Sequence, residues 1–357
     1  MKYPARIFCN PFSRGSALEN KRYSRQSILP QIGNVGQEKI QSLRVLVLGC
    51  GALGSGCAEL LARAGVGFLR IVDRDVVELS NLQRQHLFDE TDVIECRPKA
   101  RAAAERLRKI NSSITIEEKI LDIHAGNIES LLENIDAVID GMDRLEMRYL
   151  LNDACVKKNV PWFYGAVQGI SSVWMTVVPH KGPCLRCVFP EAPAPGSLPT
   201  CDMSGVLGAA VSVSAAMEVT QLLRYFVGDI TEATPNFVLT KMNLWTGEMT
   251  RIPVVRDEDC PCCGRGFFSF LDGPRDLVNP LCGHGAIQIS PSRERFLNLP
   301  DLAKRIDSMA DSVTLREDLL EIKKGELRIL LFPSGRAIVY GERDPLRAKI
   351  WVEKYVG

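Results

Sequence analysis

The sequence has almost no net charge. Its 44 lysines and arginines nearly balance its 43 aspartates and glutamates, which leaves a formal charge of +1 over 357 residues. Proteins that bind nucleic acid usually carry a clear cationic excess, so the charge gives no support for a nucleic-acid partner. With 46% hydrophobic and 24% charged residues, the chain has the composition of an ordinary globular protein.

Long apolar runs are also missing. No segment approaches the roughly 20 apolar residues that a membrane helix needs, and residues 1–26 lack the apolar middle of a signal peptide. We therefore expect a cytoplasmic protein with no membrane association. In a reducing compartment, paired cysteines more often bind metal or act chemically than form structural disulfides, which bears on the 12 cysteines of this chain.

Histidine is scarce. The chain has 4 histidines, and none has an evident catalytic setting. An NAD-dependent oxidoreductase needs a group that handles protons or orients the hydride, so this enzyme class is disfavoured.

The pattern of apolar residues predicts two folded units after a flexible N-terminal arm, residues 1–20. Residues 21–268 first alternate strand and helix, as parallel sheets require, and later show the alternating pattern of antiparallel strands. Residues 275–357 form a second, smaller unit of a normal domain size. The predicted fold class is α/β: a Rossmann-like mixed sheet, parallel in its N-terminal half and antiparallel in its C-terminal half, plus a small α/β C-terminal domain.

A glycine-rich turn, "GCGALG", follows a buried apolar strand and opens a helix. It places Gly49, Gly51 and Gly54 where backbone N–H groups can hold phosphate and the ligand can approach closely. Asp73 closes the next strand at about the 20-residue spacing at which an acid accepts hydrogen bonds from a ribose. The pattern predicts a nucleotide site, and a close-packed turn without a ligand is the alternative.

The residues that follow favour ATP. Asn81 and Arg84 come just after the strand that Asp73 closes, and Lys99 lies in the first turn of a helix opened by Pro98. Two cations and an amide suit a triphosphate undergoing displacement at phosphorus, although each cation alone could be a solvated surface charge. Asp143 lies beyond the C-terminal end of a later apolar strand, where it could hold Mg²⁺ or cap the next helix.

Two cysteine pairs have the same C-x-x-C spacing: Cys184 with Cys187, and Cys260 with Cys263. Four thiolates in two such pairs fit tetrahedral Zn²⁺, while metal-free thiols or a disulfide are the alternatives. A zinc ion here would join the two ends of the antiparallel segment, which is a structural role. The spacing leaves out Cys262.

Cys201 lies apart from these pairs, in a loop rich in proline, glycine and serine that we expect to run into a helix near Ser204. A thiol near a helix N-terminus has a lowered pKa and is more nucleophilic. Cys201 is therefore a candidate catalytic residue, with an incidental loop thiol as the alternative. Four other cysteines stand in apolar contexts and are expected to be buried small hydrophobes: Cys50, Cys57, Cys96 and Cys155.

The ordered run of "RYSRQ", "GCGALG", "IVDRDVVELSNLQRQ", "RPKA", "DGMDR", "CLRC", "PTCDMSGVLG" and "CPCCG" resembles the ubiquitin-activating-enzyme superfamily over about residues 20–264. The MoeB, ThiF and HesA branch is the most similar. The resemblance implies an adenylyltransferase that uses ATP and Mg²⁺ to activate the C-terminal glycine of a small ubiquitin-fold sulfur-carrier protein ending in Gly-Gly. The product would serve sulfur transfer in thiamine, molybdopterin or tRNA thiolation. The alternative is activation of a ubiquitin-like modifier for conjugation through a Cys201 thioester.

The same resemblance implies roles for individual residues. The nucleotide contacts that it implies are Gly49, Gly51, Gly54, Asp73, Asn81, Arg84, Lys99 and Asp143. Arg25 matches an arginine that reaches the ATP of a neighbouring subunit, which implies a homodimer. Cys201 matches a thiol that in several members takes the activated carrier. The family usually has asparagine directly after the position of Asp143, whereas this chain has Arg144, whose role stays open.

The C-terminal unit lacks the loop cysteine of a rhodanese domain, because the only cysteine after residue 263 is Cys282. It resembles the tail of some ThiF-like proteins. We expect it to dock a carrier or a sulfur donor such as a cysteine desulfurase, or to pack on the dimer. An accessory role in stability is an equal alternative.

Overall fold

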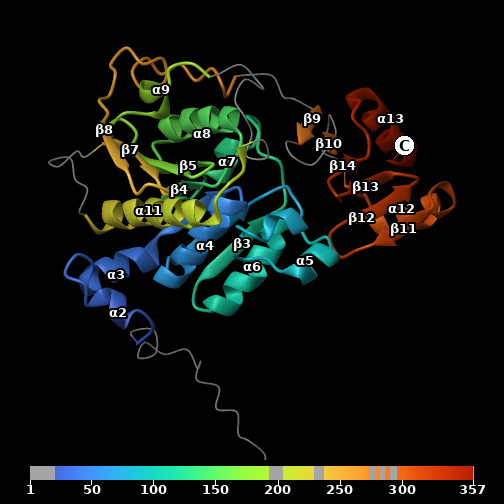
Figure 1. Cartoon of the computed structure of the whole chain (residues 1–357), viewed down its shortest axis with the longest axis horizontal. Coiled ribbons are helices and arrows are strands. Elements are labelled where there is room, and N and C mark those ends of the chain that lie inside the picture. Colours follow the sequence, from blue (N-terminus) through green and yellow to red (C-terminus); the bar gives the residue numbers. More distant parts are fainter. Residues whose placement is uncertain are drawn as a thin grey trace, which may run out of the picture.

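The computed structural model describes residues 21–192, 204–228, 237–272, 278–281, 286–289 and 296–356. These residues form an eight-stranded sheet with helices and a separate six-stranded sheet with helices, seen on the left and the right of Figure 1. The predicted α/β class is therefore confirmed. Among the described residues, no helix has the length and apolar character needed to cross a membrane.

The larger sheet has the strand order β3-β2-β1-β4-β5-β6-β7-β8. Its strands are β1 (Arg44–Leu48), β2 (Phe68–Val72), β3 (Thr115–Lys119), β4 (Ala137–Asp140), β5 (Trp162–Gln168), β6 (Ser171–Val177), β7 (Val238–Asn243) and β8 (Met249–Pro253). Pairing is parallel from β3 to β5 and antiparallel from β5 to β8. This mixed topology confirms the expected change halfway along the sheet.

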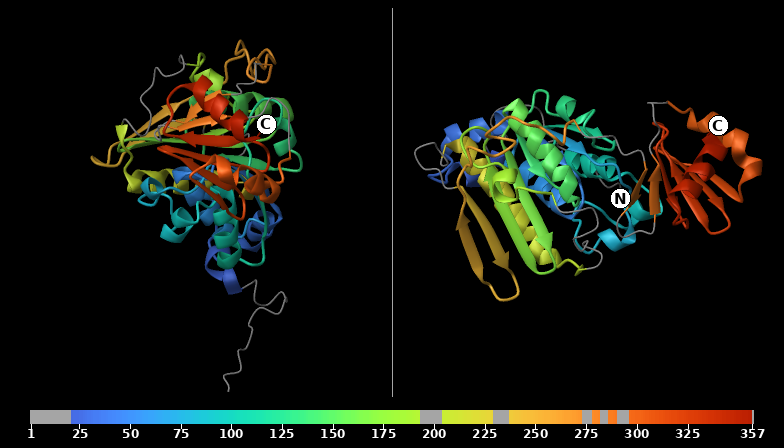
Figure 2. Two further views of the ribbon diagram at one scale, coloured as in Figure 1. Left: turned by 90° about the vertical axis from the view of Figure 1, so that its right-hand side faces the viewer. Right: turned by 90° about the horizontal axis from the view of Figure 1, so that it is seen from above.

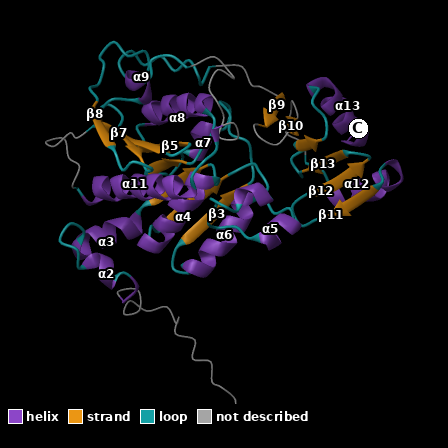
Figure 3. Cartoon of the chain, in the orientation of Figure 1, coloured by secondary structure: helices purple, strands orange, loops and turns teal. Residues whose placement is uncertain are grey.

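Helices cover both faces of this sheet (Figure 3). One face carries α3 (Gly33–Ser42), α4 (Ala52–Ala64), α6 (Lys99–Ile110) and α11 (Gly208–Val227), and the other carries α7 (Ile128–Leu131), α8 (Leu145–Lys158) and α9 (Leu185–Val188). Strand β1 lies between them with four fully buried residues, which is why its sequence is an unbroken apolar run. The remaining short helices are α2 (Ser24–Ser27), α5 (Glu90–Ile94) and the 3-10 turn η1 (Leu79–Asn81).

Helix ends follow the local sequence with small differences from expectation. Helix α11 ends at Val227 and is closed by Gly228 as its C-cap, as predicted, because glycine readily takes the left-handed conformation found there, with φ 99°. Helix α6 begins at Lys99, and Pro98 is its N-cap and not its first residue. Pro98 is instead paired with Val76 in an isolated antiparallel bridge, which keeps its backbone extended.

The second sheet has the order β11-β12-β13-β14-β10-β9. Its strands are β9 (Val278–Leu281), β10 (Ala286–Ile289), β11 (Ser312–Leu315), β12 (Leu320–Lys324), β13 (Leu327–Leu331) and β14 (Ala337–Tyr340), with α12 (Leu299–Ile306), η2 (Asp307–Met309) and α13 (Pro345–Val356) beside them. Strand β11 was not expected from the sequence, since it is an edge strand with no buried residue. The predicted domain boundaries stay a prediction.

The second sheet packs against the segment that connects β2 to α6. Val76 from this segment is buried in one cluster with Leu330 and Ile338 of the second sheet and with Phe332, which directly follows β13. Figure 1 shows α5 beside the second sheet, and Figure 2 shows the C-terminal unit, in red, next to the first unit. The C-terminal unit therefore contacts the part of the chain that leads from Asp73 to Lys99.

Candidate nucleotide and metal sites

The predicted nucleotide residues follow three neighbouring parallel strands. The glycine turn follows β1, Asp73 follows β2, and Asp143 follows β4, and these strands are adjacent in the order β2-β1-β4. Chain order reverses direction at β1, so this is a topological switch point, where open α/β sheets bind ligands beyond their carboxyl ends.

The three glycines of the turn differ in how much space surrounds them. Gly49 has φ 83°, and a side chain there would approach the carbonyl oxygen of Gly141 at 2.6 Å. A methyl group on Gly54 would overlap the carbonyl oxygen of Gly49. Gly51 faces open space, because its nearest neighbour would be the Gln85 Nε2 atom at 3.9 Å. The space in front of Gly51 is the one that a ligand can enter.

Gly51 is also the N-cap of α4, and no side chain caps this helix. The first backbone N–H groups of a helix have no partner within the helix, and the helix dipole gives this end a partial positive charge. The start of α4 is thus suited to hold a phosphate. The start of α4 has no side-chain cap, and the space at Gly51 is open. The glycine turn therefore fits a nucleotide.

Asp73 is tied to the glycine turn. Its carboxylate accepts hydrogen bonds from the backbone N–H of Cys50 at 2.6 Å and from that of Asp75 at 2.7 Å. Burial raises the pKa of Asp73, and the charge of Lys99 opposes this rise. Asp73 therefore joins the end of β2 to the glycine turn after β1.

Lys99 lies among carboxylates at the start of α6. It is 7% exposed, and its Nζ atom lies 3.6 Å from Asp75 Oδ2. Burial alone would lower the pKa of Lys99, but Asp75, Asp73 and Asp143 raise it above its usual value. The side chain is therefore charged, and Asp143 lies near enough to act on it.

Asn81 and Arg84 lie in the segment between β2 and α6. Asn81 is buried and uses its Oδ1 atom to accept the backbone N–H of Glu78 at 3.1 Å, within the short turn η1. Arg84 is half-buried and donates to the carbonyl of Ser80 at 2.8 Å. Both side chains have local structural bonds, and their contacts to phosphate stay a prediction.

Asp143 is exposed in the loop between β4 and α8. The N-cap of α8 is Arg144, which makes no side-chain capping bond, so the alternative of Asp143 as the N-cap is wrong. Asp143 also acts on the charge of Arg74, whose pKa is raised by Asp75, Asp122 and Asp143 against the effect of burial. Its carboxylate is thus not the N-cap of α8, and it acts on the charges of two cations, Arg74 and Lys99.

Sequence reasoning missed the ion pair that supports this loop. Asp140 is fully buried and accepts from Arg148 Nε at 2.7 Å and from the backbone N–H of Met142 at 3.0 Å. Arg148 also donates to the carbonyls of Met142 at 2.7 Å and Gly165 at 2.9 Å. The pair fixes the backbone directly before Asp143. The only sequence signal was a charged residue at the end of an apolar strand.

Arg25 lies on α2 and is exposed. In the described chain Arg25 belongs to α2 and is not part of the glycine turn. Its proposed reach to a neighbouring subunit stays a prediction.

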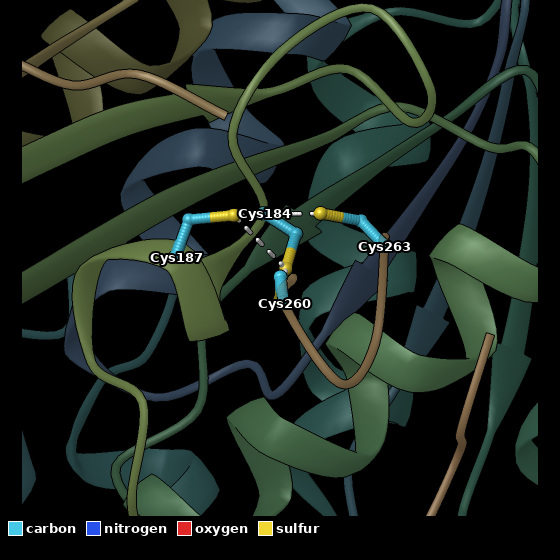
Figure 4. A group of neighbouring side chains, drawn as sticks. All are labelled: Cys184, Cys187, Cys260 and Cys263. Carbon is cyan, nitrogen blue, oxygen red and sulfur yellow. Dashed lines mark hydrogen bonds between the residues drawn. The ribbon is translucent and has the colours of Figure 1, made fainter. Parts of the chain in front are cut away.

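The four predicted zinc cysteines come together (Figure 4). All four Sγ atoms lie within 4.8 Å of one another, with Cys184 to Cys260 at 3.6 Å, Cys187 to Cys263 at 3.4 Å and Cys184 to Cys187 at 3.9 Å. A tetrahedral ion with zinc–sulfur bonds of about 2.3 Å places its ligands about 3.8 Å apart. These separations fit zinc, and all exceed the roughly 2.05 Å of a disulfide bond.

Cys262 is outside this cluster, as expected, but it is not without a contact. Its Sγ atom accepts a hydrogen bond from Asn152 Nδ2 at 3.2 Å, and Asn152 Oδ1 accepts the backbone N–H of Leu185 at 2.8 Å. Asn152 on α8 therefore links the two cysteine loops. Cys50, Cys57, Cys96 and Cys155 are buried as predicted. Cys201 and Cys282 lie outside the described residues.

A protein-family model described as "ThiF family" matches residues 23–262. The chain is 38% identical over 339 residues to the "Sulfur carrier protein ThiS adenylyltransferase" of Bacillus subtilis (strain 168), which covers 94% of this chain and 99% of that relative. An alignment of this length includes the six-stranded sheet. The chain is also 38% identical over 252 residues to the "SAMP-activating enzyme E1" of Haloferax volcanii, covering 70% of this chain and 91% of that relative.

Among solved structures, "Crystal structure of E. coli MccB" is similar with a TM-score of 0.61 and 24% identity, covering 70% of this chain and 74% of that chain. At this identity the likeness supports the fold alone.

Proposed function

The chain belongs to the ThiF family, and from this premise we propose that it adenylates the C-terminal glycine of a ubiquitin-fold sulfur-carrier protein with ATP. The names of the relatives give the reaction class. The observation that carries the proposal in this chain is the open, uncapped glycine turn at Gly51, beside the cation and carboxylate cluster of Lys99 and Asp143.

The reaction fits the residues at the site. The carrier's terminal carboxylate attacks the α-phosphorus of ATP, an oxygen–phosphorus bond forms, and pyrophosphate leaves with the electron pair of the broken bond. A carboxylate is already ionised at pH 7, so no general base is required, in agreement with the scarcity of histidine. Cations such as Lys99 and Arg84 would offset the charge that develops on the phosphates.

We infer that Asp143 holds Mg²⁺ against the phosphates. It is exposed, follows a strand end at the switch point, and has its backbone fixed by the buried Asp140–Arg148 pair. When bound, Mg²⁺ would neutralise phosphate charge. Asp73 would hold the ribose, and Asn81 would contact a phosphate if its turn opens toward the ligand.

We further propose that Cys184, Cys187, Cys260 and Cys263 hold a structural zinc ion, and that Arg25 completes the site of a second subunit in a homodimer. The separations of the four sulfur atoms support the first point. The exposure of Arg25 supports the second. A zinc ion with four thiolate ligands has no open position, so it takes no part in the reaction.

The test is ATP–pyrophosphate exchange with a purified ubiquitin-fold protein that ends in Gly-Gly. We expect exchange that requires both this carrier and its last glycine. Asp143→Ala should lower the exchange rate by about 100-fold or more, the scale seen when one electrostatic group of an active site is removed.

Asp307→Ala is the matched control, because Asp307 is an exposed carboxylate at the end of α12 in the second unit. It should leave the rate unchanged. Exchange at the wild-type rate in Asp143→Ala, or a chain that shows no exchange with any Gly-Gly carrier, would overturn the proposal.

A further inference from the structure

One arginine of the C-terminal unit reaches the turn that carries Asp73. Arg336 precedes β14 and is 4% exposed. Its Nη2 atom donates to the backbone carbonyl of Arg74, and its guanidinium lies over the Phe332 ring, 3.8 Å from the ring centroid. A planar guanidinium stacked on a ring and bonded to a carbonyl has little freedom to move. The contact therefore holds the Arg74 backbone in one position.

A second bridge starts from the same guanidinium. Arg336 Nη1 donates to Gln288 Oε1 at 3.3 Å, and Gln288 Nε2 donates to Asp122 Oδ2 at 2.5 Å. The other oxygen of Asp122 accepts from Arg74 Nη1 at 3.0 Å. Both the backbone and the side chain of Arg74 are thus linked to the second sheet.

The residues on both sides of Arg74 belong to the candidate nucleotide site. Asp73 accepts from the Cys50 N–H of the glycine turn. The carbonyl of Asp75 accepts the backbone N–H of Lys99 at 2.9 Å, and its carboxylate lies 3.6 Å from Lys99 Nζ. A shift of the Arg74 backbone would therefore move the ribose acid and the phosphate cation together.

Charge favours the same arrangement. Burial, together with the nearby Arg74 cation, lowers the pKa of Arg336 to about 10, and the charges of Asp75, Asp122 and Asp73 oppose this fall. Arg336 remains a cation at pH 7. The carboxylates at the site thus have a buried counter-charge that comes from the C-terminal unit.

Other contacts of this interface lie farther from the turn. Tyr340 donates to Glu78 Oε1 at 3.0 Å, and Arg316 Nη1 donates to the carbonyl of Ile94 in α5 at 3.1 Å. Arg316 is bonded mainly to Glu321 of its own sheet, at 2.6 Å. It belongs to the same interface as Arg336 without touching the Asp73–Asp75 turn, which makes it a matched control.

We propose that Arg336 is a positioning residue for ATP: by holding the Arg74 backbone, the C-terminal unit keeps Asp73 and Lys99 in the geometry that binds the nucleotide. This inference rests on the proposed function for the identity of the ligand. It gives the C-terminal unit a role in nucleotide affinity, in addition to any role in docking or stability.

The experiment compares Arg336→Gln, Arg336→Lys and Arg316→Gln with the wild-type chain. Calorimetric titration with ATP gives the Kd, and pyrophosphate exchange gives kcat and the KM for ATP and for the carrier. Arg336→Gln should raise the Kd and KM for ATP about 10-fold, within the usual range of coupling between linked sites. The kcat and the carrier KM should stay within about twofold of wild type. Arg316→Gln should match wild type throughout.

Arg336→Lys keeps the charge but loses the planar fork, so its ATP Kd should lie between the other two values. Hydrogen exchange gives a readout at the site itself: the amides of Cys50 and Asp75, which donate to Asp73, should exchange faster in Arg336→Gln and not in Arg316→Gln. If Arg336→Gln fails to fold, Arg336→Lys alone must show the higher Kd and the faster exchange at these two amides.

The outcomes separate this inference from the proposed function. A wild-type chain that binds no ATP overturns both. If wild type binds ATP and the Arg336 variants bind it equally well, only the inference is overturned. Equal losses of affinity in Arg336→Gln and Arg316→Gln would show that the interface acts through general stability, and a fall in kcat at constant KM would also contradict positioning of ATP.

Discussion

At the scale of single residues, the glycine turn shows that one motif combines packing with binding. Gly49 and Gly54 are required because the backbones of β1, α4 and the Gly141 loop approach too closely for any side chain. Gly51 has no such neighbour. The motif therefore contains two glycines that the fold needs and a third, Gly51, that leaves room for the proposed ligand.

This distinction predicts opposite behaviour for two alanine variants. In a helix, replacing glycine by alanine usually stabilises by about 0.5–1 kcal/mol. Gly54→Ala should instead destabilise by several kcal/mol, since its methyl group overlaps the carbonyl of Gly49. The free energy of unfolding of Gly51→Ala should lie within about 1 kcal/mol of that of wild type. This variant should nevertheless bind ATP at least 10-fold more weakly.

Thermal unfolding and ATP titration of both variants check this prediction. A Gly51→Ala protein that binds ATP normally would mean that the space beside Gly51 is not the phosphate position. A stable Gly54→Ala protein would show that the turn can rearrange.

Some residues of the candidate site could be predicted from the sequence, and others could not. Gly49, Gly51, Gly54 and Asp73 could be proposed as nucleotide residues because their spacing along one βαβ unit matches a nucleotide-binding pattern. The Asp140–Arg148 pair was missed because its meaning depends on burial and on a partner in another element. Sequence alone does not tell a buried carboxylate from one that faces solvent.

At the scale of elements, the cysteine cluster joins two segments that are far apart in the sequence. Cys184 is the N-cap of α9 and Cys187 lies within this helix, while Cys260 and Cys263 follow β8. The regular spacing of each pair made this site predictable, because tetrahedral ligands in a C-x-x-C turn need that geometry. The position of Cys262 against Asn152 could not be foreseen, since it depends on how α8 packs.

Two serine variants distinguish ligand from neighbour. Cys263→Ser should lose bound zinc and lower the unfolding temperature, because a structural zinc contributes directly to folding. Cys262→Ser should keep one zinc per chain. Elemental analysis after dialysis, together with thermal unfolding, measures both effects. Equal zinc content in the two variants, or none in wild type, would contradict the assignment.

At the scale of the whole molecule, protonation of Asp140 should act on stability and activity in opposite directions. Burial raises its pKa to about 6, although Arg148 pulls it down. Because this value exceeds the usual 3.8, the folded chain binds more protons than the unfolded chain between about pH 4 and 6. The free energy of unfolding therefore falls as pH rises through this window, by at most about 3 kcal/mol from this group.

Activity should rise over the same window, because only ionised Asp140 forms the ion pair with Arg148 that fixes the loop before Asp143. Denaturant unfolding and exchange rates across this pH range measure both trends. Asp140→Asn should flatten each profile relative to wild type. If stability and activity changed with pH in the same way in Asp140→Asn and in wild type, the protonation of Asp140 would not be their cause.

The composition predicted a large unit and a small one, and the mixed sheet agrees with the apolar patterns. The placement of the second sheet was beyond prediction, because it rests on single contacts such as Arg336 with the carbonyl of Arg74 and on the burial of Val76. These contacts join residues that are separated by most of the chain length, so no local sequence pattern indicates them.

The burial of Val76 has a consequence for the order in which the protein is made. A ribosome releases the strand β2 and the Asp73–Val76 turn well before it reaches Leu330 and Ile338, which cover Val76 in the finished chain. During this interval the nascent protein exposes an apolar side chain close to its candidate nucleotide site. A first sheet that forms before synthesis ends has this edge uncovered, and the last strands to emerge are the ones that close it.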